Sequence, residues 1–145
     1  MMLCLRIHRG MPLHGDDETW VRAKAGQAAQ FFATDLAAHF KAEEQALFPA
    51  MRDFAGAAEL INDLISEHRK LGTLAEQFCE TGGAQLVDAL GEFADLLEAH
   101  IRKEERELFP LYEKEAGADL AEEVGRAVRN VVGDATQPRD RELLR

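Results

Sequence analysis

The sequence predicts an all-α protein: an up-down antiparallel four-helix bundle with a shortened first helix and an extra C-terminal helix. Two observations lead to this fold class. Ala, Leu, Glu, Lys and Arg dominate the chain, and they favour helices, whereas proline occurs only four times. Glycines and prolines gather between stretches whose apolar residues recur at three- and four-residue steps. Short loops between long amphipathic helices favour antiparallel neighbours.

The predicted helices follow one another between these breaks. Gly10, Pro12 and Gly15 mark a first loop, after which Asp16, Asp17 and Thr19 offer N-caps for a long second helix. In chain order, the helices are expected at about 2–9, 17–48, 57–80, 84–111 and 118–132. We therefore expect one helical domain over residues 1–132, followed by a polar, fraying tail over residues 133–145.

Length and charge exclude several classes of function. A chain of 145 residues fits one domain with a real core, and its net charge of −10 disfavours binding to nucleic acid or to an anionic membrane. No apolar run approaches a membrane span, and the first residues lack the features of a secretory signal. We expect a cytoplasmic protein, with Cys4 and Cys79 as buried thiols.

The strongest feature is an internal repeat. FATDLAAHFKAEEQALFP, which begins at Phe32, and FADLLEAHIRKEERELFP, which begins at Phe93, are identical at ten of 18 positions and lie 61 residues apart. Core packing alone explains the shared Phe and Leu residues, but it does not require the shared His and Glu. The repeat therefore indicates a duplicated functional element.

Each copy contains a histidine and a glutamate one helical turn apart, His39 with Glu43 and His100 with Glu104. A single pair of this kind is more often an ion pair on a solvated helix face. Here each histidine continues a stripe of Phe and Leu, so both imidazoles should point inward. Two buried carboxylates repel one another unless a cation lies between them. The pattern predicts a metal site with nitrogen and oxygen ligands, which suits iron, manganese or zinc.

His68 is a third candidate ligand, on the third predicted helix. It precedes the loop at Gly82 and Gly83 by about as many residues as His100 follows it, so the two lie at similar heights on antiparallel neighbours, to within about 6 Å. Alone, His68 would more often be a surface or capping residue. Together with the two histidine–glutamate pairs, it fits the same metal site.

The segments HFKAEEQALFP, SEHRKL and HIRKEERELFP resemble the hemerythrin-like HHE cation-binding domain, over roughly residues 3–115. The resemblance implies an oxo- or hydroxo-bridged di-iron centre within a four-helix bundle. It implies that Glu43 and Glu104 bridge the irons, that His68 and His100 cap one iron and that His39 helps to cap the other. The expected cofactor is one or two non-haem irons, although another divalent metal would fit. Glu44 and Glu105 belong to the motif without being implied as ligands.

The first helix departs from the family pattern, which places one more histidine ligand there. His8 and His39 would differ by about 19 residues, or about 28 Å along antiparallel axes, and His14 falls in a loop. We expect that the ligand-bearing start of helix one is absent and that the iron it would serve is bound more weakly. The missing turns should leave an apolar groove, filled either in a homodimer or by the C-terminal helix.

These features predict a metal-binding protein that is not an enzyme, with O2, NO or peroxide as the small ligand it binds or senses, or with a role in iron storage. One alternative is an oxidoreductase that uses the same iron. Another is a structural or interaction bundle whose metal site has decayed. A ferritin-type site fits poorly, because that pattern uses Glu-x-x-His at three-residue spacing.

Overall fold

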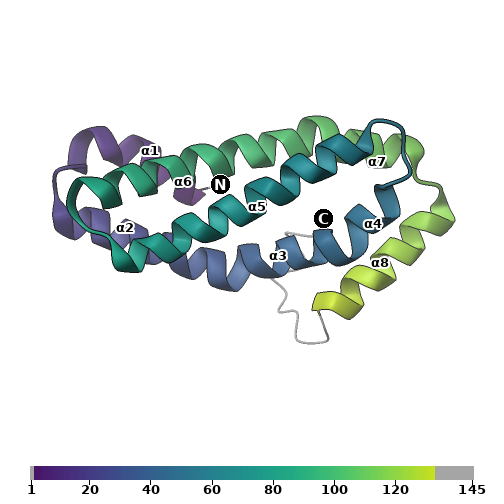
Figure 1. Ribbon diagram of the computed structural model, residues 1–145, viewed down its shortest axis with the longest axis horizontal. Coiled ribbons are helices and arrows are strands. Elements are labelled where there is room, and N and C mark those ends of the chain that lie inside the picture. Colours follow the sequence, from purple (N-terminus) through teal and green to yellow (C-terminus); the bar gives the residue numbers. More distant parts are fainter. Residues whose placement is uncertain (1, 133–145) are drawn as a thin grey trace. The chain divides into compact units, whose positions relative to one another are not determined.

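The computed structural model describes residues 2–132, and every regular element in that range is helical, which confirms the all-α prediction (Figure 1). The predicted tail over residues 133–145 lies outside the described residues. No helix within residues 2–132 is long and apolar enough to span a membrane. In chain order the elements are α1 (Met2–His14), α2 (Glu18–Phe31), η1 (Phe32–Leu36), α3 (Ala37–Ala42), η2 (Glu43–Leu47), α4 (Phe48–Met51), α5 (Ala57–Glu80), α6 (Gly83–Lys103), η3 (Glu104–Leu108), α7 (Phe109–Glu115) and α8 (Ala118–Val132).

The first helix is longer than predicted. The prediction ended it near Arg9, but α1 continues through Gly10 and Pro12 to His14. Gly10 does not break the helix; a Cβ there would lie 2.1 Å from a ring carbon of Trp20, so glycine allows this close approach. Pro12 has no N–H to donate to the carbonyl of His8, and α1 ends two residues later at His14. The loop between α1 and α2 is correspondingly short.

The second predicted helix contains two π-helical turns, η1 and η2, and the fourth contains one, η3. In η2 the N–H of Phe48 donates to the carbonyl of Glu43, five residues back, just before Pro49. Proline has no N–H, and its ring crowds the carbonyl four residues earlier, so a wider turn relieves this clash. The same turn recurs as η3, before Pro110. With these turns, the second predicted helix continues through Pro49, beyond its predicted end at Phe48, and the fourth continues through Pro110.

The described chain divides into two compact units. The first contains the described residues up to Phe32 together with Ser66–Lys103, and here α1 packs against α6 and α2. Its core is the predicted apolar stripe of α6, in which Phe93 meets Phe78 of α5 edge-on at 5.4 Å. Asp17 caps α2 by accepting hydrogen bonds from the backbone N–H groups of Thr19 and Trp20. Cys4 is buried here, which raises the pKa of its thiol, but Cys79 is exposed, so its predicted burial was wrong.

The second unit contains Ala33–Ile65 together with the described residues from Glu104 onward. Its core is a cluster of six buried residues from α4, the start of α5 and the end of η3, namely Phe48, Met51, Ala57, Ile61, Leu64 and Leu108. The C-terminal helix α8, yellow-green in Figure 1, packs against α3 and η2 and buries Val124.

Candidate metal centre

The second unit brings together His39, Glu43 and Glu104. His39 lies in α3, one turn before Glu43, and Nε2 of its ring is 3.1 Å from Oε1 of Glu43. The same nitrogen is 3.8 Å from Oε2 of Glu104. Both glutamates are buried, and each is the first residue of a π-helical turn. Turns of this type occur frequently at functional sites.

The carboxylates of Glu43 and Glu104 both act on the imidazole of His39. Burial lowers the pKa of His39, but hydrogen bonds to Glu104 and Glu43 and the charges of both more than offset this and raise it from 6.5 to about 10. In the metal-free protein His39 is therefore an imidazolium at neutral pH. Its positive charge lies where two buried carboxylates need a cation, which a metal ion would supply more strongly.

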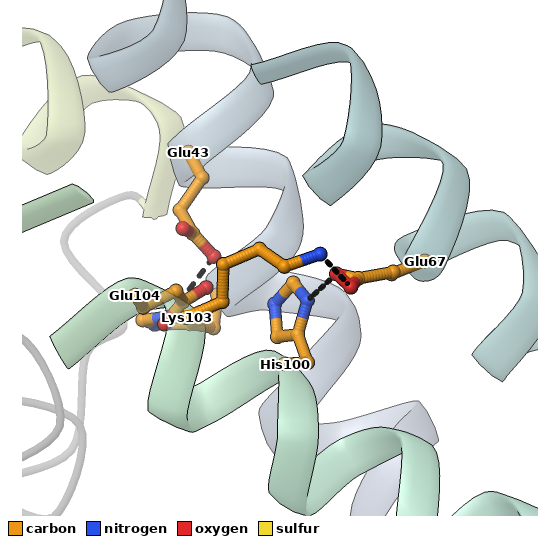
Figure 2. A network of polar contacts seen from close by, with 6 residues as sticks. Glu43, Glu67, His100, Lys103 and Glu104 are labelled. Carbon is orange, nitrogen blue, oxygen red and sulfur yellow. Dashed lines mark hydrogen bonds and ion pairs between the residues drawn. The ribbon is translucent and has the colours of Figure 1, made fainter. Parts of the chain in front are cut away.

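The first unit brings together His68 and His100. His68 lies on α5 and His100 in the last turn of α6, with ring centroids 4.8 Å apart and both side chains buried. Nδ1 of His100 is 3.2 Å from Oε2 of Glu67, whose other oxygen lies 2.6 Å from Nζ of Lys103 (Figure 2). The Nδ1 atom of the His100 ring therefore already contacts a carboxylate on α5.

Comparison with known proteins gives the family. The chain matches the hemerythrin HHE cation-binding domain over residues 2–112. It belongs to this family. It is also 30% identical over 91 residues to a DNA nickase of Nostoc sp. (strain PCC 7120 / SAG 25.82 / UTEX 2576), an alignment that covers 61% of this chain and 26% of the nickase. The chain thus spans about a quarter of that relative's length. No solved structure matches it significantly.

The buried side chains offer ligand atoms suited to a cation, in keeping with a cation-binding family. Buried residues able to hold a metal ion include Glu43, His68, His100 and Glu104. Two imidazoles and two carboxylates form the mixed nitrogen and oxygen set that iron, manganese and zinc accept. His39 adds a third imidazole, which contacts both carboxylates directly. The residues present therefore fit a metal centre of hemerythrin type.

Other residues singled out from the sequence have different surroundings. His8, which was not expected to be a ligand, lies with Nε2 2.7 Å from Asp95 and Nδ1 3.2 Å from Glu98. The motif residues Glu44 and Glu105 are exposed, in agreement with their interpretation as solvated or outer groups. Sequence reasoning did not single out Glu67; its only signal was its position directly before His68.

Proposed function

We propose that this protein binds non-haem iron in one centre of di-iron type, held by His39, Glu43, His68, His100 and Glu104. The observation that carries the proposal is the placement of His39 against two buried carboxylates, 3.1 and 3.8 Å away. A protein core tolerates such a pair of carboxylates only beside a positive charge. Membership of a cation-binding family makes a metal ion the natural source of that charge.

Two of the proposed ligands lie on one continuous helical run. His100 and Glu104 occupy successive turns of the unbroken helical run from α6 into η3, so they face the same side. We assign Glu43 and Glu104 as bridging ligands, His68 and His100 to one iron, and His39 to the other. The matching topology is an up-down four-helix bundle over residues 1–132, which we propose as well.

Iron in such a centre supplies reversible redox chemistry and an open position for a small ligand. Of the histidines in our ligand set, only His39 would hold the second iron, so a small ligand would bind more readily there. We propose O2 or NO binding, with sensing or storage as the role. Peroxide fits the same position.

The test compares the two buried glutamates with their exposed neighbours. Wild type, Glu43→Gln/Glu104→Gln and Glu44→Gln/Glu105→Gln are reconstituted anaerobically with ferrous iron, and iron per chain and the optical spectrum in air are recorded. We expect one or two irons per chain in wild type and in the Glu44→Gln/Glu105→Gln variant. The Glu43→Gln/Glu104→Gln variant should retain less than a tenth of the wild-type iron, because each of its two substitutions removes a charged ligand. Equal iron in all three proteins would refute the proposed ligand set.

The alternatives predict different outcomes of the same experiment. An oxidoreductase would bind the same iron and also turn over peroxide or NO in the steady state. A bundle with a decayed site would bind no iron in any form. We do not transfer DNA nicking to this chain, since a net charge of −10 disfavours phosphate contacts and the chain spans about a quarter of the nickase.

A further inference from the structure

Glu67 is a partly buried glutamate, and each of its two carboxylate oxygens contacts another side chain. Oε2 lies 3.2 Å from Nδ1 of His100, and Oε1 lies 2.6 Å from Nζ of Lys103 (Figure 2). Its side chain is 15% exposed, and that of His100 is 1% exposed. Water therefore has little access with which to replace the contact between the carboxylate and the ring.

This contact determines which proton the His100 ring carries. A carboxylate only accepts hydrogen bonds, so Nδ1 of His100 must carry the hydrogen and donate it to Glu67. A neutral imidazole then presents its lone pair at Nε2, on the opposite side of the ring. In metalloproteins, an acceptor on the outer nitrogen of a ligand histidine sets the orientation of the ring and raises its basicity.

We propose that Glu67 is a positioning residue of the metal centre, which holds His100 as the Nδ1–H tautomer with Nε2 presented to the metal. The proposal rests on the proposed function. Glu67 directly precedes His68, so α5 provides one ligand itself and orients a second one on α6. Two rings whose centroids are 4.8 Å apart are thereby fixed from a single helix.

Lys103 keeps Glu67 in this outer role. The ammonium offsets the charge of the carboxylate, so the Glu67–Lys103 pair adds no net charge beside the centre. It also contacts the oxygen that His100 does not use, so that both oxygens of Glu67 have a partner. Removing Lys103 should therefore weaken the selection of His100 as the ligand, although less than removing Glu67 itself.

The experiment uses the full chain with Glu67→Ala, Glu67→Gln and Lys103→Met. Glu92→Ala is the matched control, because Glu92 forms a 3.0 Å ion pair with Lys70 that also joins α5 and α6 but involves no imidazole. We expect Glu67→Ala to weaken ferrous iron binding about 10- to 100-fold. Glu67→Gln keeps an acceptor and should lose less, and Glu92→Ala should bind as wild type does. Equal losses in Glu67→Ala and Glu92→Ala would overturn the proposal.

A second measurement needs no metal. Side-chain 1H–15N spectra of metal-free protein should show His100 as the Nδ1–H tautomer in wild type and in Glu92→Ala. In Glu67→Ala that proton should exchange rapidly, or the ring should change to the Nε2–H tautomer. An Nε2–H ring in wild type would overturn the role of Glu67. Failure of wild type to bind iron would instead overturn the proposed function, and the tautomer result would still decide how Glu67 orients the ring.

Glu67→Gln guards against a folding artefact. It is nearly the same size as the native side chain, so it should fold where an alanine leaves a gap. Circular dichroism of each variant establishes that the helices have formed. A folded Glu67→Gln protein with wild-type iron affinity, beside a Glu67→Ala protein with equally unchanged affinity, would show that the ring needs no support from α5.

Discussion

The two copies of the internal repeat have matching sequences and different surroundings. Phe48 and Phe109 occupy equivalent positions, directly after a π-helical turn and before a proline, but Phe48 is fully buried and Phe109 is 37% exposed. The preceding leucines show the reverse: Leu108 is fully buried and Leu47 only partly. Residues at equivalent positions are thus fully buried in one copy and partly exposed in the other.

The histidines differ in the same way. The side chain of His39 is 24% exposed and meets two carboxylates directly, whereas that of His100 is 1% exposed and is held from behind by Glu67. The repeat supplies the same donor atoms twice. The two copies differ in specific contacts: α8 packs against α3 and η2 of the first copy, and Glu67 of α5 contacts His100 of the second.

The largest expected effect tests the phenylalanine contrast. Phe48→Ala should lower the free energy of unfolding by about 3–5 kcal/mol, because it leaves a cavity in the buried cluster. Phe109→Ala removes the same atoms from a partly exposed position and should cost about 1 kcal/mol or less. Urea denaturation of both variants measures the difference, and similar losses would mean that the two copies are packed equivalently.

A smaller effect concerns α8 and the first copy. Val124→Ala should cost about 1–2 kcal/mol, because it removes two buried carbon atoms from the helix that covers α3 and η2. Hydrogen exchange should quicken at the amides of these two elements and stay unchanged in α6. Glu122→Ala, an exposed position on α8, provides the control. Uniform quickening across α6 would argue against a specific role of α8 in the first copy.

The environment of His39 predicts a dependence on pH in the metal-free protein. Its pKa rises from 6.5 to about 10 on folding, so its stabilising contribution is complete below pH 6.5 and disappears as the pH rises through about 10. Melting temperatures of wild type should therefore fall across this interval more than those of His39→Gln. Parallel curves for the two proteins would show that the carboxylates do not hold the imidazolium.

The smallest effect concerns α1, which precedes the first copy. It exposes Met2, Leu5 and Leu13, the last at 75%. We expect the predicted homodimer to use this face, and Leu13→Glu to weaken it about tenfold, or about 1.4 kcal/mol. Size-exclusion chromatography with light scattering measures the association, and a monomeric wild type at every concentration would exclude the dimer.

Much of the fold can be predicted from the helical spacing of apolar residues and from the glycines and prolines between the helices. The predicted bounds of α5 and α8 agree with the structure, because each begins after an evident loop and follows one apolar stripe. The candidate ligands could be found because a repeated His-x-x-x-Glu on an apolar face is rare without a function. The structure places His68 beside His100, and His39 beside both glutamates.

The remaining features depend on contacts that are distant in sequence. Gly10 was taken as a helix breaker because nothing nearby indicates that Trp20 needs its space. The second helix was predicted to end before Pro49, although a wider turn there lets the helix continue. Glu67 acts on a residue 33 positions away, so no local pattern could reveal its contact with His100.

The π-helical turns also have a consequence for how these helices could change in length. A turn such as η2 or η3 contains one residue more than an α-helical turn, while the segments on either side keep their facing. Removing a single exposed residue from it would shorten the chain without rotating His39 relative to Phe48. In a regular α-helix the same deletion would turn every later side chain by about 100°. Glu43 and Glu104 thus begin the segments in which these helices can best accept a change of one residue.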